Sequence, residues 1–445
     1  MKDEIIEQRP DSSLIPHTSS FSADDSSLIV PPSSFSSELA AIRDQGLYRV
    51  RRRLQSAQGP RIRWKGREFL NFSSNDYLNL AADPRLARAA ARAAGRYGVG
   101  AGASPLISGL SPPLRRLERD LAAWEETEAA LVFSSGFAAN LGVIGALAGP
   151  DDAVLSDAYN HASLIDGCRL SKARVHVYRH ADVHHLDELL RREGQSARRR
   201  LIVTDSIFSM DGDGAPLREI MELAREHDAL VVLDEAHATG VLGEKGLGLA
   251  EMLLASLTPR VSVSHTNPRR ERGNRAPTRS VSEEAFGDRL IRIGTLSKAL
   301  GSQGGFVCGS RPLIQLLVNR CRPYIYSTAL APPCAAAARR AVALVQAEPN
   351  RRQHLLGLAA VLRARLQDLG FAGTRSQCHI VPVIVEEATK AMELSARLAD
   401  RGLLVPAIRP PSVPEGTSRL RISLTAGHTE EDVERLVLEL KRSRY

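Results

Sequence analysis

The sequence predicts an α/β fold in which helices flank a mostly parallel sheet, followed by a smaller α+β domain at the C-terminus. The main observation is a set of six short apolar runs that alternate with helical patterns, at 131–133, 153–155, 201–204, 230–233, 290–293 and 305–308. Strands that are buried on both faces and separated by helices form parallel, right-handed sheets. Ligands bind beyond the carboxyl ends of such strands, so the residues directly after each run are candidate site residues.

Composition narrows the class of protein. The 445 residues, 43% of them apolar, leave room for two domains. The net charge of +8 comes from scattered arginines, and an aromatic content of 4% offers few stacking platforms, so we expect no nucleic-acid function. No apolar run approaches a membrane span and the N-terminus lacks a signal-peptide pattern, so we expect a cytoplasmic protein. The five cysteines are widely spaced and form no Cys-x-x-Cys pair, which argues against a disulfide framework or a zinc site, and we expect no metal.

Four segments are predicted along the chain. Residues 1–36 are rich in serine, repeat short motifs at a spacing of 14, and are expected to be a disordered tail. Residues 37–75 form an N-terminal helical arm and 76–330 the large α/β domain, which carries a flexible insertion at 254–289. Residues 331–445 form the small domain, which begins with a helical stretch at 333–367 and adds strands at 380–385 and 420–424.

Candidate ligand contacts precede the sheet. Arg49 and Arg51 stand in a cationic run that is either solvated or a clamp for a carboxylate or phosphate. Asn75, in a polar loop, is either a turn residue or a ligand-facing amide. The glycines of 98–102 mimic a dinucleotide fingerprint, but they follow a helical stretch where a strand is required, so we reject that interpretation.

The strand ends carry the remaining candidates, each with a plain structural alternative. Ser135-Gly136-Phe137 opens a helix after the first run and is either a simple cap or a phosphate site. His161 and Ser209 follow the second and third runs, where a lone histidine is more often a packing residue than a chemical one. Asp234 and His237 follow the fourth, and an inward-facing aspartate needs a partner.

Lys298 lies on a turn of small residues at 294–301, between the last two runs. It is either a solvated turn lysine or a lysine whose amine forms a Schiff base. One ligand accounts for the whole set of strand ends, namely pyridoxal phosphate, which combines an aldehyde, a ring nitrogen and a phosphate. The expected contacts are Lys298 with the aldehyde, Asp234 with the ring nitrogen, Gly136, Phe137 and Thr295 with the phosphate, His237 and Ser209 with the ring oxygen, and His161 with the ring face.

The motifs together resemble the α-oxoamine synthases among the fold-type I pyridoxal-phosphate enzymes, over residues 38–442. The matching segments are 74–78, 135–140, 161–163, 208–213, 234–237 and 295–298. Residues 407–417 and 420–422 are most similar to the biotin-forming members. This resemblance implies a decarboxylative condensation of L-alanine with a pimeloyl thioester, carried on coenzyme A or acyl carrier protein, by a homodimer that shares its active sites.

The resemblance also assigns roles to residues of this sequence. It implies that Arg421 and Asn75 hold the carboxylate of the amino acid, that Arg49 contacts substrate with Arg51 as the fallback, and that Ser412 lies near the acyl pocket. Asn79 stands where the family usually has glycine, and Ser412 where its biotin-forming members usually have threonine.

Two other functions remain open from the sequence. The nearer one is a sister condensing enzyme that uses glycine or serine with another acyl thioester. The other is a noncatalytic protein that binds pyridoxal phosphate or nucleic acid, with the basic insertion at 254–289 as its working surface.

Overall fold

The computed structural model describes residues 33–193, 196–257, 287–371 and 375–443. The chain forms two compact units, Met1–Arg53 and Leu54–Tyr445. In the first unit α1 (Ser33–Asp44) begins inside the stretch predicted to be a tail and covers the start of the predicted helical arm. Most of that tail, and most of the insertion predicted at 254–289, lies outside the described residues.

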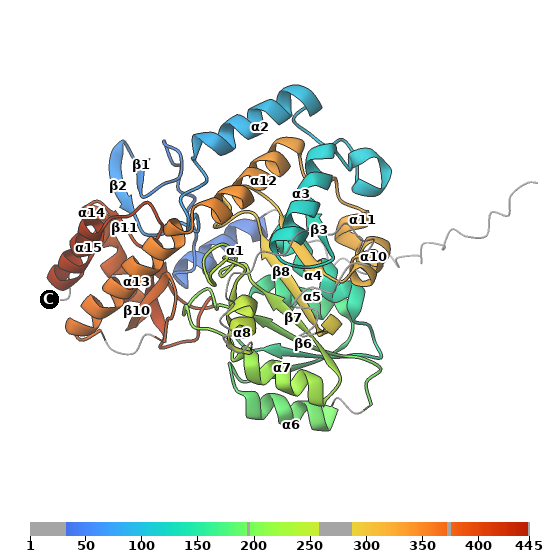
Figure 1. Cartoon of the computed structure of the whole chain (residues 1–445). Helices are drawn as coiled ribbons and strands as arrows, with labels where there is room; N and C mark the ends of the chain where they lie inside the picture. Colours follow the sequence, from blue (N-terminus) through green and yellow to red (C-terminus); the bar gives the residue numbers. More distant parts are fainter. Residues whose placement is uncertain (1–32, 194–195, 258–286, 372–374, 444–445) are drawn as a thin grey trace, which may run out of the picture. The chain divides into compact units, whose positions relative to one another are not determined.

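A seven-stranded sheet forms the centre of the second unit, in the order β3-β9-β8-β7-β6-β4-β5 (Figure 1). β9 runs antiparallel to its neighbours β3 and β8, and the other neighbouring strands pair in parallel. The predicted mostly parallel sheet is therefore confirmed. Its strands are β3 (Ala129–Phe133), β4 (Ala153–Asp157), β5 (Arg174–Tyr178), β6 (Arg200–Asp205), β7 (Ala229–Asp234), β8 (Leu290–Thr295) and β9 (Gly305–Gly309).

The sequence prediction missed one strand of this sheet, β5. It pairs only with β4, so it lies at the sheet edge, and Arg174, Val175 and Val177 are exposed. An edge strand with a solvated face shows no continuous apolar run, which is the signal that identified the other six strands.

Helices cover the sheet on both faces (Figure 1). The helices between residues 84 and 325 are α2 (Pro84–Tyr97), α3 (Pro112–Trp124), α4 (Gly136–Leu147), α5 (Ala162–Ser171), α6 (Val183–Glu193), α7 (Leu217–Glu226), α8 (Leu249–Leu257), α10 (Arg311–Arg320) and α11 (Arg322–Ile325), with a π-helical turn at Pro105–Gly109 and a 3-10 turn at Gly287–Arg289. α4 is apolar on nearly every side, and its Val143 and Ile144 pack in one core with Ile293 and Val307 of the sheet. Among the helices of the described residues, none combines the length and hydropathy that a membrane span needs.

The C-terminal part contains the two strands predicted at 380–385 and 420–424, as β10 (Ile380–Glu386) and β13 (Ser418–Ser423), which form a sheet with β12 (Ala407–Ile408). A second small sheet joins β1 (Arg61–Trp64), β2 (Arg67–Asn71) and β11 (Leu403–Leu404). The helical stretch predicted at 333–367 is two helices, because Pro349 interrupts the pattern and caps the second one. The helices of this part are α12 (Pro332–Ala347), α13 (Asn350–Asp368), α14 (Ala388–Asp400) and α15 (Glu430–Ser443).

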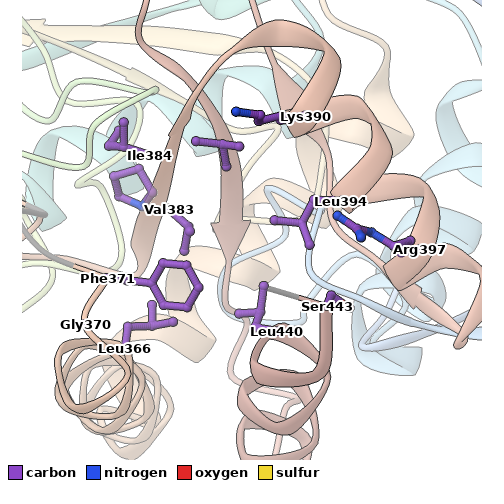
Figure 2. Close-up of a pocket in the computed structure, with 12 residues that line it drawn as sticks. Leu366, Gly370, Phe371, Val383, Ile384, Lys390, Leu394, Arg397, Leu440 and Ser443 are labelled. Carbon is purple, nitrogen blue, oxygen red and sulfur yellow. The ribbon is translucent and has the colours of Figure 1, made fainter. Parts of the chain in front are cut away.

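A cavity of about 300 Å³ lies beside β10, between the end of α13 and the helices α14 and α15 (Figure 2). Phe371, Leu394 and Leu440 give it an apolar wall, and Lys390 and Arg397 supply its cations. None of the site residues predicted from the sequence lines this cavity.

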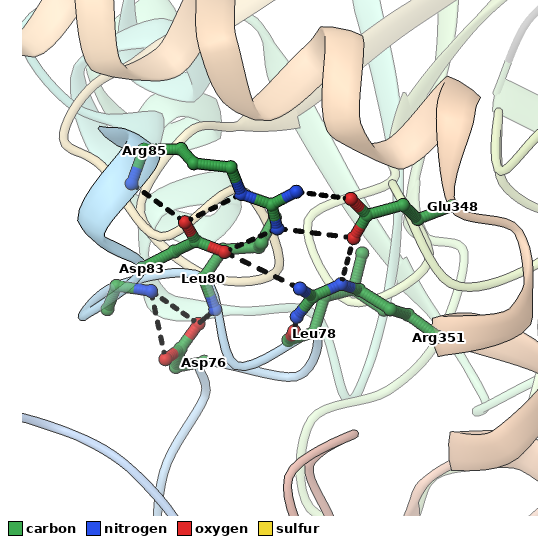
Figure 3. Close-up of polar contacts among 8 residues, drawn as sticks. Asp76, Leu78, Leu80, Asp83, Arg85, Glu348 and Arg351 are labelled. Carbon is green, nitrogen blue, oxygen red and sulfur yellow. Dashed lines mark hydrogen bonds and ion pairs between the residues drawn. The ribbon is translucent and has the colours of Figure 1, made fainter. Parts of the chain in front are cut away.

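An ion-pair cluster of Asp83, Arg85, Glu348 and Arg351 joins the start of α2 to the junction of α12 and α13 (Figure 3). Asp83 caps α2 and lies 2.7 Å from the Arg85 guanidinium, which also contacts Glu348. Arg351 donates to the Leu78 carbonyl oxygen at 3.0 Å. The cluster therefore fixes the loop that carries Asn75 and Tyr77 against the C-terminal helices.

Candidate active site

The turn that carries Lys298 follows β8 directly and closes at Gly301, which has φ +58°. A Cβ at Gly301 would lie 2.4 Å from the Ala81 nitrogen, so the turn tolerates no side chain there. The Lys298 amine lies 2.8 Å from Nε2 of His237. Burial lowers the pKa of Lys298 to about 8, although the nearby carboxylates of Asp234 and Asp205 act in the opposite direction.

Two aspartates face this lysine from adjacent strand ends. Asp205 ends β6 and Asp234 ends β7, and they are register partners. Asp234 accepts hydrogen bonds from Nδ2 of Asn140 at 2.6 Å and from the Ala236 nitrogen at 2.8 Å. Burial, with Asp234 as a close negative neighbour, raises the pKa of Asp205 well above its usual range. Asp234 is therefore held by two donors, and the carboxyl group of Asp205 tends to stay protonated.

His161 caps the N-terminus of α5 and lies beside the aspartates. Its backbone N–H donates to Asp205 at 2.7 Å, and its Nδ1 lies 2.7 Å from Oγ of Ser163. Ser163 also accepts a hydrogen bond from Asn140 of α4, and the same Asn140 amide donates to Asp234. His161 is therefore connected to Asp234 through Ser163 and Asn140. Burial lowers the pKa of His161, so the ring is neutral near neutral pH.

A chain of polar contacts runs from the lysine to a cation. Nδ1 of His237 lies 2.6 Å from the Tyr77 hydroxyl, which donates to Oδ1 of Asn75 at 3.1 Å. Arg421 donates to the same oxygen at 3.4 Å. Burial keeps the pKa of His237 well below its ordinary value, and one proton order satisfies every contact: Lys298 donates to Nε2, Nδ1 donates to the Tyr77 oxygen, and Tyr77 donates to Asn75.

The first turn of α4 meets Thr295 at the end of β8. Oγ of Ser135 caps the helix by accepting from the Ala138 nitrogen, which leaves the N–H groups of Gly136 and Phe137 without an intrahelical acceptor. A Cβ at Gly136 would lie 3.3 Å from Oγ1 of Thr295, so glycine lets the hydroxyl approach the helix end. Backbone N–H groups and a hydroxyl converging at the N-terminus of a helix suit a phosphate.

A cavity of about 540 Å³ is lined by three of the predicted residues, His161, Ser209 and Ser412, whereas Lys298, Asp234 and Thr295 do not belong to its lining. The Ser209 carbonyl oxygen accepts a hydrogen bond from Nε of Arg421, so the carboxylate-binding candidate also holds this wall. Asn79, where the family usually has glycine, has φ +53°, a region that asparagine tolerates better than most residues. Arg49 and Arg51 belong to the first unit, and their role stays a prediction.

Several residues of the site escaped the sequence prediction, namely Tyr77, Asn140, Ser163, Asp205 and His379. Asp205 ends a strand as Asp234 does, so the same rule of strand ends could have found it. Tyr77 and Asn140 stand in motifs that were recognised without a role for these side chains. His379 is fully buried with its ring centroid 3.8 Å from that of Tyr77, and its ring nitrogens have no hydrogen-bond partner among the described residues. No sequence signal distinguished it.

The site fits pyridoxal phosphate on the donors and acceptors just described. A buried amine of lowered pKa lies near a carboxylate held by two donors, a helix N-terminus with free Gly136 and Phe137 N–H groups, and a neutral imidazole. Asn140 adds a buried Oδ1 that has no hydrogen-bond partner among the described residues. Such unpaired buried polar groups are expected where a ligand completes the network.

Known proteins resemble this chain over most of its length. The sequence profile of the family described as aminotransferase class I and II matches residues 67–440. An 8-amino-7-oxononanoate synthase of Anaeromyxobacter sp. (strain K) is 49% identical over 89% of this chain and 92% of that protein. One of Alkalilimnicola ehrlichii is 47% identical over 91% of this chain and 96% of that protein. Among solved structures, a serine palmitoyltransferase of S. paucimobilis with a bound PLP–myriocin aldimine has a TM-score of 0.80 and 28% identity, covering 92% of this chain and 96% of that one.

Proposed function

This chain belongs to the aminotransferase class I and II family, and we propose that it condenses L-alanine with a pimeloyl thioester. The products are 8-amino-7-oxononanoate, carbon dioxide and the free thiol, so the reaction serves biotin synthesis. Relatives of that name align with this chain over about nine-tenths of its length at close to half identity, which supports the assignment. The observation that carries it is the contact chain from the Lys298 amine through His237 and Tyr77 to Asn75 and Arg421.

Pyridoxal phosphate is the proposed cofactor, and the residues of the site divide its groups among them. Lys298 would hold the aldehyde, Asp234 the ring nitrogen, and His237 with Ser209 the ring oxygen. The first turn of α4, with Thr295, would hold the phosphate, and His161 would lie against the ring. When bound, the cofactor supplies an electron sink for the electron pair left on the α-carbon of the substrate.

The chain's own residues prepare proton transfer. A Lys298 amine with a pKa of about 8 is partly neutral near pH 7, so it can take the α-proton of the amino acid. The Lys298 amine donates a hydrogen bond to Nε2 of His237, and this contact orients the lone pair of the amine. Asp234, held in place by Asn140 and the Ala236 nitrogen, would present its carboxyl group to the ring nitrogen.

Arg421 and Asn75 orient the amino acid in this proposal. The guanidinium of Arg421 suits a carboxylate, and Asn75 already accepts from both Arg421 and Tyr77. A carboxylate bound to Asn75 would be connected to the proton-transferring lysine through three hydrogen-bonded side chains, those of Asn75, Tyr77 and His237. His161 would polarise or protonate the reacting carbonyl in this proposal.

A homodimer that shares its active sites is part of the proposal, with Arg49 as the substrate contact from the N-terminal arm and Arg51 as the alternative. Replacing each in turn with alanine distinguishes them. Replacing the contacting arginine should raise KM for a substrate about tenfold, because a charge-assisted hydrogen bond is lost. Replacing the other arginine should leave KM unchanged.

Product analysis tests the function directly. The protein loaded with pyridoxal phosphate is incubated with pimeloyl-coenzyme A and alanine, glycine or serine in turn, and the products are identified by mass spectrometry. We expect 8-amino-7-oxononanoate from alanine and at least about tenfold slower turnover of glycine and serine, since a pocket shaped for one methyl group discriminates by about 1–3 kcal/mol. A preference for serine would favour the second candidate, a condensing enzyme like the structurally similar serine palmitoyltransferase.

A further inference from the structure

A groove of about 450 Å³ lies between α2, α3 and α12, and α12 packs against both of the other helices (Figure 1). Alanines form part of its lining, so the three helices pack closely there and longer side chains rise around them. Those longer side chains are mostly arginines, and they come from all three helices: Arg92, Arg96, Arg116, Arg339 and Arg340.

The charges of this arginine groove are not balanced by the chain. Asp120 is the one carboxylate in its lining, and it pairs with Arg339. Arg92, Arg96, Arg116 and Arg340 are exposed and form no ion pair with any described residue. Like charges around one groove repel each other, and salt screens this repulsion only in part over such short separations. An anionic partner would remove it.

The groove is connected to the lysine site through α12. Oγ of Ser302, on the loop that follows Lys298, donates to the Cys334 carbonyl oxygen at 2.9 Å, so the first turn of α12 is held against that loop. Arg339 stands five residues further along the same helix, which corresponds to about 8 Å of helix axis. A partner seated in the groove would therefore lie within reach of the site for an extended thiol arm.

We propose that the arginine groove is the docking surface for an acidic acyl carrier protein that delivers the pimeloyl thioester. This inference rests on the proposed condensation and names its acyl donor. Arg92 and Arg96 are one turn apart on α2, a spacing that matches carboxylates repeated along the helix of a partner, and guanidinium groups bind carboxylates in a bidentate manner. Five cations spread over three helices exceed what one nucleotide phosphate engages. Tyr97 is the one aromatic residue in the lining, which disfavours a nucleic acid.

The test compares two donors that carry the same acyl group. The kcat/KM of the holoenzyme is measured with pimeloyl-acyl carrier protein and with pimeloyl-coenzyme A, for the wild type and for Arg92→Glu/Arg96→Glu. We expect the variant to lose about 10- to 100-fold with the carrier protein and less than about twofold with coenzyme A, because charge reversal removes steering of a large acidic partner. The matched control is Arg225→Glu/Arg320→Glu, which changes the net charge equally at exposed positions outside the groove.

Direct binding separates this inference from the proposed function. If the wild type turns over neither thioester, the proposed condensation fails, and the affinity for acyl carrier protein, measured by calorimetry at low and high salt, still decides the docking surface. Binding that weakens with salt and is lost in the double variant, but not in the control, supports it. Equal losses of kcat/KM with both donors would overturn the docking surface. So would an Arg92→Glu/Arg96→Glu variant that keeps its melting temperature, its kcat/KM and its affinity for the carrier protein.

Discussion

The lysine site and the ion-pair cluster both collect charged side chains, but the surroundings act on those charges in opposite directions. In the ion-pair cluster, hydrogen bonds from Arg85 lower the pKa of Asp83 to about 2, so the carboxylate is stabilised by its own chain. In the lysine site burial has the larger effect, and it lowers the pKa of Lys298 to about 8 and raises that of Asp205. Each charge of the ion-pair cluster has a partner of opposite charge. In the lysine site, the neighbouring groups do not fully offset the cost of burying the charged forms of Lys298 and Asp205.

This difference separates residues that stabilise the fold from residues that are arranged for chemistry. Charges paired near the surface contribute modestly to stability, and the pairing favours the charged form of each group. Charges held in a dry site with incomplete partners cost stability and gain reactivity. Changes in the lysine site should therefore alter activity far more than stability, and changes in the ion-pair cluster should do the reverse.

The largest expected effect is that of Lys298→Ala. Removing the amine should lower turnover of alanine and pimeloyl-coenzyme A by at least about a thousandfold, because proton transfer and cofactor attachment both depend on it. It should also abolish the visible absorbance of the protein loaded with pyridoxal phosphate. Lys441→Ala, at an exposed position of α15, is the control, and substantial turnover by Lys298→Ala would remove the lysine from the mechanism.

The pH dependence of cofactor uptake measures the lowered pKa itself. Only the neutral amine attacks an aldehyde, so uptake of pyridoxal phosphate by the cofactor-free protein should rise about tenfold per pH unit up to pH 8 and then level off. If the lysine had its ordinary pKa, the rate of uptake would continue to rise up to about pH 10.5. Stopped-flow absorbance between pH 6 and 10 checks this, with Nα-acetyl-lysine, whose ε-amine is free, as the reference amine.

Tyr77→Phe should have an intermediate effect. The variant keeps the ring and loses the hydroxyl that orders the proton of His237, so we expect about a tenfold loss in kcat/KM for alanine, which corresponds to one hydrogen bond. Because burial raises the pKa of Tyr77 to about 12, its ionisation should not enter the profile below pH 10. The pH profile of the variant should shift, whereas that of Tyr326→Phe, at an exposed position, should not.

The smallest effect on activity is expected in the ion-pair cluster. Asp83→Asn should lower the free energy of unfolding by about 1–2 kcal/mol at pH 7 and change kcat/KM less than twofold. The pKa of Asp83 is about 2 in the folded protein and 3.8 when unperturbed, so its stabilisation is present above pH 4 and is lost as the pH falls to about 2. Urea unfolding at several pH values checks this trend.

The matched control for this change is Asp166→Asn, which removes an exposed ion pair with Arg169 and should cost less than about 0.5 kcal/mol. A loss of activity in Asp83→Asn larger than its loss of stability would contradict the separation of the two regions.

The sequence alone predicted the α/β class, the strands with continuous apolar runs and the order of the strand-end motifs. These features are local: a buried strand needs an apolar run, and a turn needs small residues, so each leaves a readable pattern. β5 escaped because its exposed positions, Arg174, Val175 and Val177, leave no buried apolar run. Gly136 and Lys298 were found because their neighbours in sequence give the strand end and turn in which they lie.

Tertiary structure decided which of these residues meet. Asn75 and Arg421 are 346 residues apart and share one hydrogen bond, and the adjacency of Asp205 and Asp234 follows from strand register. The pKa of Lys298, the neutral ring of His237 and the unbalanced arginines of the groove likewise depend on burial and on charges from distant segments. A sequence fixes which side chains are present along a strand or helix, whereas their solvation and electrostatic partners exist only once the sheet and helices have packed.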